Sequence, residues 1–279
     1  MASPCEVLIK TQDKIFCEKL AQLTTSEVSR IENKYSRYKT TNLLSQINSS
    51  NGGSIEIDNE TFQLLNYAKE IFDLSDGLFD ISSGVLGKFW TFKNQIHIPD
   101  NQDIKKALSQ IGFNKINYTG KNISLPKGMK IDFGGIGKEY AVDQVAKILN
   151  AHCKIKSDNF LVNLGGDLFA KDYNNTDDEL QNEAWKVGLE NPKSGYINLL
   201  NGAVATSGTS QRSFIQNGKT YSHLLNPKTG WPIENPPSSV TCFAETCVLA
   251  GTYSSLAMLQ GSDAESFLES EEIEHILVR

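Results

Sequence analysis

Residues 129–171 read MKIDFGGIGKEYAVDQVAKILNAHCKIKSDNFLVNLGGDLFAK, and this stretch decides the fold class. Its pattern predicts, in order, a strand, a glycine-rich turn, a helix and two strands: 129–132, 134–137, about 138–150, 159–164 and 166–171. Only a short glycine pair, Gly165-Gly166, connects the last two strands. A helix followed by a hairpin favours an α+β fold over the steady strand–helix alternation of a doubly wound sheet.

The residues before this stretch are mainly helical in pattern. Apolar residues recur at three- to five-residue steps from Phe16 to Ile31 and again from Phe62 to Phe72, which indicates two amphipathic helices. Asp58 stands where it can cap the second helix. Residues 76–84 are so rich in Gly, Ser and Asp that we expect no regular element there. The expected elements are a strand at 5–10, helices at 13–33, 42–48, 60–75 and 101–111, and strands at 115–118 and 121–125.

The residues after this stretch form short strands and then two helices. Residues 172–183 are polar and acidic, and we expect them to form a mobile loop. The expected elements are strands at 184–190, 197–200, 203–206, 213–216, 219–222, 239–244 and 274–278, and helices at 246–261 and 263–269. Together the patterns predict one α+β domain over residues 1–279, in which mixed, largely antiparallel sheets pack against helices.

Composition and charge argue against several classes of protein. The 279 residues carry a formal net charge of -6, whereas nucleic-acid binding needs a basic face that neutralises phosphates. No apolar run reaches the roughly 18–20 residues that span a bilayer. The N-terminus has no basic segment followed by an apolar one, so we expect a cytoplasmic protein. The Cys residues form no C-x-x-C pair, and four His residues are too few for a His-rich metal centre.

Two glycine-rich turns could approach a phosphate group. In residues 132–138 (DFGGIGK), a carboxylate, three glycines and Lys138 lead into a helix, and backbone N–H groups at a helix N-terminus favour an anion. The string is neither G-x-G-x-x-G nor a Walker A loop. Residues 163–167 (NLGGD) suggest a bulge or a close backbone approach between two strands. Taken alone, each turn could equally be a structural connection.

Three further segments carry hydroxyl side chains, and two of them also carry basic side chains. Residues 205–212 (ATSGTSQR) end in Arg212, and residues 221–232 (YSHLLNPKTGWP) contain His223, a residue type that readily carries a proton near neutral pH. Beside two leucines, His223 could equally be a hydrogen-bonded core residue. Residues 250–257 (AGTYSSLA) predict a helix of small and hydroxyl residues that packs closely on a ligand or on its neighbours.

Together, and in this order, the segments resemble the family of FAD:protein FMN transferases, also called the thiamine-biosynthesis lipoprotein family. The resemblance covers nearly the full chain. The matching segments are 1–4 (MASP), 35–38 (YSRY), 44–48 (LSQIN), 77–81 (GLFDI), 132–138 (DFGGIGK), 163–167 (NLGGD) and 222–230 (SHLLNPKTG). The last two are the hardest to attribute to chance. The resemblance implies an α+β flavin-transferase architecture of the T-fold type.

The resemblance also implies a phosphoryl-transfer reaction. A Ser or Thr hydroxyl of an acceptor protein attacks the phosphorus on the FMN side of FAD, and AMP leaves. Mg²⁺ would bridge the diphosphate oxygens. Two alternatives stay open, namely a protein that binds FAD without transferring FMN and a Mg²⁺-dependent FAD pyrophosphatase in which water replaces the acceptor hydroxyl.

Each matching residue then takes a role from the resemblance. His223 and Asp132 are the catalytic candidates, and His223 would transfer a proton or stabilise a phosphate. The residues expected to contact FAD are Met1, Tyr38, Leu78, Phe79, Asp80, Asp132, Lys138, Ser207, Gly208, Arg212 and His223. The backbone carbonyl of Gly135 and the hydroxyl of Ser255 are the expected Mg²⁺ ligands.

Two positions depart from the family pattern. Gly251 stands where the family commonly has an Asp that binds the metal, so a hard cation loses its best charged ligand. Glu139 stands where the family usually has Gly, and its charge beside Lys138 would weaken an anion site unless it points to solvent. Three outcomes stay open: weaker Mg²⁺ binding, a ligand from elsewhere in the chain, or FAD binding without transfer.

Overall fold

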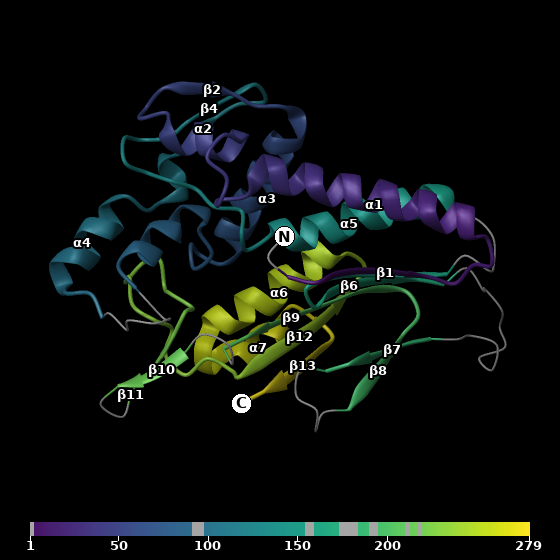
Figure 1. Ribbon diagram of the computed structural model, residues 1–279. Helices are drawn as coiled ribbons and strands as arrows, with labels where there is room; N and C mark the ends of the chain where they lie inside the picture. Colours follow the sequence, from purple (N-terminus) through teal and green to yellow (C-terminus); the bar gives the residue numbers. More distant parts are fainter. Residues whose placement is uncertain are drawn as a thin grey trace.

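The computed structural model describes residues 3–90, 98–153, 159–172, 184–189, 195–209, 213–216 and 219–279. Within these residues, a six-stranded sheet has the strand order β1-β5-β6-β9-β12-β13 (Figure 1). Its strands are β1 (Cys5–Ile9), β5 (Phe160–Leu164), β6 (Asp167–Lys171), β9 (Gly202–Gly208), β12 (Ser239–Ala244) and β13 (His275–Val278). Every neighbouring pair is antiparallel, and helices pack on the sheet, which confirms the predicted α+β class.

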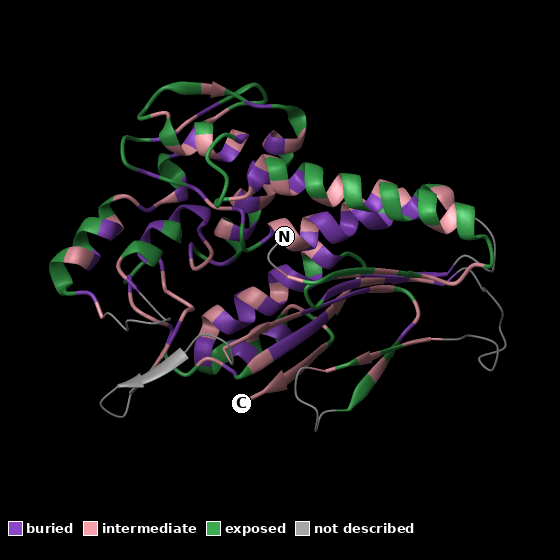
Figure 2. Cartoon of the chain, viewed as in Figure 1, coloured by how far each residue is buried: buried purple, intermediate pink, exposed green. Residues whose placement is uncertain are grey.

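Two buried helices, α5 (Gly137–His152) and α6 (Cys247–Gln260), pack on one face of this sheet. Because successive strand residues point to opposite faces, Phe160, Val162 and Leu164 of β5 all join the core on the helix side. The helix α1 (Lys14–Tyr35) packs on α5 as an outer layer, and Figure 2 shows its exposed residues on the side away from α5. This burial fixes the register, since a one-residue slip would turn the apolar set outward.

The opposite face of the sheet is covered in part by a two-stranded ribbon. This ribbon pairs β7 (Trp185–Gly188) with β8 (Tyr196–Leu199), and Figure 1 shows it on the side of the sheet away from α5. Val187 and Leu199 of the ribbon pack in one apolar cluster with Leu161 and Val204 of the sheet. The ribbon therefore forms a side wall for the part of this face that stays open.

Residues 43–124, as far as they are described, build a group of short elements beside the helix layer (Figure 1). Its elements are α2 (Leu43–Ser49), β2 (Ser54–Glu56), α3 (Asn59–Leu74), η1 (Ile81–Lys88), α4 (Asn101–Ser109), η2 (Phe113–Lys115), β3 (Asn117–Tyr118) and β4 (Asn122–Ser124). As predicted, Asp58 caps α3 by accepting a hydrogen bond from the backbone N–H of Thr61 at 3.0 Å. The remaining elements are β10 (Ser213–Gln216), β11 (Lys219–Ser222), η5 (Gly261–Asp263) and α7 (Ala264–Ser270).

Two predictions for the middle of the chain are wrong. Residues 129–132 do not form a strand, because the side chain of Asn48 takes both backbone groups of Ile131, at 2.7 and 2.9 Å. Residues 76–84 were expected to be irregular, yet η1 begins at Ile81. The Asp80 carboxylate caps this 3₁₀ helix by accepting from the backbone N–H of Ser82 at 2.8 Å.

Most other predicted elements are confirmed to within about three residues at each end. Residues 173–183, most of the segment predicted to be a mobile loop, lie outside the described residues. Of the helices in the described ranges, none combines the length and the apolar character needed to cross a membrane.

Candidate functional site

The first group of predicted site residues surrounds Asp132. Its carboxylate forms an ion pair with Arg37, with 2.7 Å between Nη1 and Oδ2, and accepts a hydrogen bond from the backbone N–H of Gly134 at 2.9 Å. Arg37 also donates to the hydroxyl of Tyr38 at 2.9 Å. Arg37 therefore joins the predicted residues Asp132 and Tyr38. Arg37 is not among the residues expected from the sequence to have a role, although a cation between two tyrosines of a matching segment is a signal that could have identified it.

The glycine turn that follows Asp132 packs against the ring of Phe79. A Cβ atom on Gly135 would lie 2.8 Å from Cε2 of Phe79, so only glycine permits this approach. Phe79 and its neighbour Leu78 are both half-buried, whereas Gly134 and Gly135 are exposed. The turn thus offers its backbone to solvent directly beside an aromatic ring.

Asp80 lies next to this ring but is engaged within the protein. Its buried carboxylate accepts hydrogen bonds from the backbone N–H groups of Ser82 and Phe113, at 2.8 and 3.0 Å. Burial raises the pKa of Asp80, although these hydrogen bonds oppose the shift. The carboxylate therefore fixes the loop that presents Phe79.

The second group is built on the first turn of α5. Nζ of Lys138 forms an ion pair with Oδ2 of Asp167, which holds the turn before α5 against the turn between β5 and β6. Burial alone would lower the pKa of Lys138. The negative charges of Glu139 and Asp167 outweigh this effect and raise the pKa. Burial also raises the pKa of Asp167, against the effect of Lys138. The N-cap residue Ile136 makes no side-chain capping bond, and the first turn of α5 holds the buried acidic residue Glu139 beside Lys138.

Hydroxyl groups connect β9 to α6 within the same group. Oγ of Ser207 lies 2.9 Å from Oγ of Ser254 and 3.2 Å from Oγ of Ser255. Ser254 in turn donates to the backbone carbonyl of Gly251 at 3.1 Å. Gly251 faces the side chain of Glu139, so this group extends from α6 back to α5.

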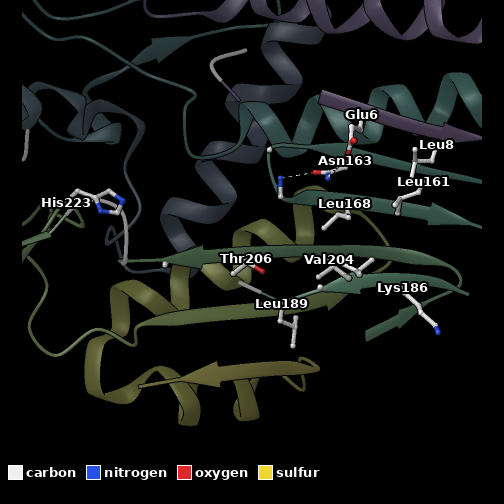
Figure 3. Close-up of a pocket in the computed structure, with 15 residues that line it drawn as sticks. Glu6, Leu8, Leu161, Asn163, Leu168, Lys186, Leu189, Val204, Thr206 and His223 are labelled. Carbon is white, nitrogen blue, oxygen red and sulfur yellow. Dashed lines mark hydrogen bonds between the residues drawn. The ribbon is translucent and has the colours of Figure 1, made fainter. Parts of the chain in front are cut away.

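The third group lines a cavity of about 620 Å³ on the partly covered sheet face (Figure 3). Its lining includes Asn163, Gly165, Gly166, Gly208 and His223. The two turn glycines have φ values of 73° and 97°, in the left-handed region that favours glycine. Oδ1 of Asn163 accepts from the backbone N–H of Gly166 at 2.9 Å and so fixes the turn. Figure 3 shows His223 at one end of the cavity, apart from the side chains of the strands.

A rigid turn after His223 fixes its place at this end. Lys228 forms an ion pair with Asp76 at 2.7 Å, which ties the turn to the loop before Phe79. The indole N–H of Trp90 donates to the carbonyl of Gly230 at 2.8 Å. Neither Trp90 nor Asp76 could be assigned from the sequence, because both contacts join residues far apart in the chain.

The strand alternation of β9 divides the predicted residues between the two sheet faces. Thr206 and Gly208 line the cavity, whereas Ser207 points to the hydroxyls of α6. The turn between β5 and β6 lies at the edge where both faces meet, since its glycines line the cavity and Asp167 pairs with Lys138. The predicted residues thus lie on both faces of the sheet near the turn between β5 and β6. Met1 and Arg212 lie outside the described residues.

The side chains described here offer mainly oxygen atoms to a metal ion. In the described ranges, no group of three or more His, Cys, Asp or Glu residues is arranged to hold one. A cation at this site would therefore depend on hydroxyl, carbonyl and single carboxylate oxygens together with oxygens of its substrate. Such ligand sets suit Mg²⁺, which usually keeps few protein ligands.

Comparisons with known proteins agree with the sequence resemblance. The model of the ApbE family matches residues 1–277. The FAD:protein FMN transferase of Haemophilus influenzae is 28% identical over 247 residues, which cover 82% of this chain and 69% of that protein. The enzyme of the same name from Treponema pallidum is 28% identical over 220 residues, which cover 72% of this chain and 60% of that protein. The crystal structure of the ApbE protein from Thermotoga maritima matches with a TM-score of 0.81 and 26% identity, covering 98% of this chain and 94% of that chain.

Proposed function

This chain belongs to the ApbE family, and we propose that it transfers FMN from FAD to a Ser or Thr hydroxyl of an acceptor protein, with release of AMP. The observation that carries the proposal is the ion pair between Lys138 and Asp167. It brings the two glycine turns together beside the cavity that His223 lines. Phosphoryl transfer depends mainly on positioning and on charge neutralisation. Lys138 offers a cation for the second purpose, and hydrogen bonds within the two turns, such as those to Asp132 and Asn163, fix its surroundings for the first.

In the proposed reaction, the acceptor oxygen forms a bond to the phosphorus of the FMN half. The bond between this phosphorus and the bridging oxygen breaks, and AMP leaves with the bridging oxygen and its electron pair. The proton of the acceptor hydroxyl passes to the imidazole of His223. Lys138, held between the two glycine turns, binds the phosphates, and Asp132, held by Arg37, orients the FMN half.

The residues present fit a divalent cation at this site. The Gly135 carbonyl and the Ser255 hydroxyl are ligands of the type that Mg²⁺ takes. Oε2 of Glu139 is buried beside Gly251 and, of the atoms described, none is its hydrogen-bond partner. A carboxylate oxygen is therefore present close to the position where the family pattern expects one. When bound, Mg²⁺ would neutralise charge on the diphosphate.

The proposal is tested by incubating the purified chain with FAD, MgCl₂ and an acceptor protein that another family member flavinylates. We expect flavin fluorescence on the acceptor band of a denaturing gel and one AMP released for each flavin transferred. An acceptor whose Ser or Thr is replaced by Ala is the control and should stay dark.

The same assay separates the two alternatives. Steady production of free FMN and AMP without acceptor would identify a pyrophosphatase. FAD binding without AMP release, in the presence of the competent acceptor, would identify a non-catalytic flavin-binding protein. Either result would contradict the transferase proposal.

A further inference from the structure

The space beside Gly251 is filled by the side chain of Glu139. A Cβ atom on Gly251 would lie 2.5 Å from Cγ of Glu139, and 3.2 Å from both its carboxylate carbon and Oε1. A side chain at position 251 would therefore clash with the Cγ methylene of Glu139 unless Glu139 moved. The Glu139 side chain fills the space next to Gly251, and its carboxylate lies beside the position from which a side chain on α6 would start.

Glu139 differs from the neighbouring carboxylates of Asp143 and Asp167 because one of its buried oxygens accepts no hydrogen bond from the described atoms. The residue is only 7% exposed, and Oε2 has no hydrogen-bond partner among the described atoms. A buried carboxylate without a partner is strongly destabilised. The neighbouring cation, Lys138, already pairs with Asp167. The Glu139 carboxylate thus lies near the charge of Lys138, but its Oε2 atom is buried with no hydrogen bond or direct ligand among the described atoms.

The other nearby carboxylate on α5 is already occupied. Asp143 accepts hydrogen bonds from the backbone N–H groups of Cys247 and Val248, at 2.7 and 3.0 Å, and so caps the start of α6. Its position is explained by this structural role. Glu139 lies one helical turn earlier on α5, and none of the described residues makes a comparable contact with its Oε2 atom.

The surroundings of Glu139 offer further oxygen atoms. Gly251 and Ser255 are four residues apart on α6, so they lie on one face in successive turns. Ser254 bonds to the Gly251 carbonyl, and both serines contact Ser207. The Ser254 hydroxyl therefore links the backbone of Gly251, next to Glu139, to the hydroxyls of Ser207 and Ser255. Hard divalent cations prefer such oxygen ligands.

We propose that Glu139, from the first turn of α5, is the carboxylate ligand of the divalent cation in this chain, in the place that Gly251 on α6 leaves empty. This inference rests on the proposed function, since the cation is the one that would bind with FAD. The family pattern has glycine on α5 and a carboxylate on α6, whereas this chain has the carboxylate on α5 (Glu139) and glycine on α6 (Gly251). The site therefore keeps its charge and its volume although two positions depart from the family pattern.

The test measures Mn²⁺ binding, because Mn²⁺ is a paramagnetic substitute for Mg²⁺ whose free concentration can be read by electron paramagnetic resonance. MnCl₂ is titrated into the full chain saturated with FAD. Glu139→Gln keeps the shape of the side chain and removes its charge, and we expect it to weaken Mn²⁺ binding at least tenfold. The control Glu265→Gln makes the same chemical change at an exposed position on α7 and should bind Mn²⁺ as the wild type does.

A reciprocal exchange tests the position of the charge. Glu139→Gly alone removes the ligand, and the double variant Glu139→Gly/Gly251→Asp returns a carboxylate from α6. We expect the single variant to lose Mn²⁺ binding and the double variant to recover it to within about threefold of the wild type. A purely structural role of Glu139 would change the melting temperature without this loss and recovery.

FAD affinity measured in chelator separates the possible failures. If Glu139→Gln binds Mn²⁺ as tightly as the wild type while FAD still binds, the inference is wrong and the proposed function stands. If the wild type itself binds no FAD, the proposed function fails first. If the double variant does not fold, the Mn²⁺ affinity of Glu139→Gln alone tests the inference.

Discussion

Lys138 at the start of α5 pairs with Asp167 at the start of β6, 29 residues later in the chain. Since Asp167 directly follows the turn that lines the cavity, this contact joins the helix side of the sheet to the cavity side. The Asp167 side chain is 4% exposed and that of Lys138 is 40% exposed. The cation can therefore hold a buried carboxylate and still meet a phosphate group that arrives from solvent.

Replacing Lys138 with Met tests this contact. The variant keeps the apolar stem but leaves the Asp167 carboxylate buried without its cation, so we expect a loss of about 2–3 kcal/mol in the free energy of unfolding. FAD binding should weaken at least tenfold. Urea unfolding and flavin fluorescence titration measure the two effects. Lys105→Met, at an exposed position on α4, should change neither, and unchanged FAD affinity in Lys138→Met would contradict the proposed phosphate contact.

Arg37→Ala tests whether the Asp132 group belongs to the FAD site. The Arg37 side chain is 50% exposed, so the ion pair contributes little to stability and the free energy of unfolding should change by less than about 1 kcal/mol. We expect KM for FAD to rise about tenfold, because Asp132 loses the group that orients it. Arg37→Lys should recover only part of this, since Arg37 contacts Asp132 and Tyr38 through two different nitrogens. An unchanged KM would place Asp132 outside the site.

His223→Gln tests the proton transfer. General acid–base groups typically contribute about 10²- to 10⁴-fold to a rate, so kcat for AMP release should fall by at least about 100-fold. FAD affinity should stay within about threefold of the wild type, because Gln retains a hydrogen-bonding side chain of similar length. Single-turnover measurements of AMP release give the rate of the chemical step. A rate close to that of the wild type would assign the proton to another group.

The ion-pair network of Glu60 predicts how stability depends on pH. Burial would raise the pKa of Glu60, but hydrogen bonds from Arg30, Lys34 and Tyr140 outweigh it and lower the pKa to about 2. Glu in an unfolded chain titrates near 4.3, so the network stabilises the fold fully above about pH 5 and loses its effect as the pH falls towards 2.

Glu60→Gln should accordingly lower the free energy of unfolding by about 2 kcal/mol at pH 7, after allowance for solvent screening of the partly exposed Arg30. The difference from the wild type should shrink as the pH falls from 5 to 3, because Glu60 takes up a proton in the unfolded chain there while the folded chain, with its pKa of about 2, keeps the carboxylate charged. Urea unfolding at pH 7, 5, 4 and 3 measures it. A difference that stays constant over this range would show that charge on Glu60 is not the cause.

Much of the fold follows from local sequence patterns. The apolar spacing of α1 and α3 and the strand pair around Gly165-Gly166 predict their elements because each depends on neighbouring residues. Residues 129–132 were predicted wrongly for the opposite reason. The partner of Ile131 is the side chain of Asn48, 83 residues earlier, and no local pattern encodes that contact.

The candidate site shows the same division. Motif residues such as Lys138 and His223 could be selected from the sequence, but the contacts that hold them in place could not. Glu139 and Gly251 lie on two different helices, so in the sequence each looks like an unfavourable departure from the family pattern. The fold shows that the Glu139 side chain fills the space next to Gly251. The single-domain organisation and the cytoplasmic location stay predictions.

A crystal structure of this chain with FAD and Mn²⁺ would test the proposed site most directly. We expect the diphosphate to lie where the turn before α5 meets the turn between β5 and β6, with Lys138 Nζ in hydrogen-bonding distance of its oxygens. His223 should lie beside the FMN phosphorus, and the anomalous signal of Mn²⁺ should lie next to Glu139. FAD bound elsewhere, for example in the cavity of about 300 Å³ between α3 and α5 that Tyr67 and Tyr140 line, would contradict it.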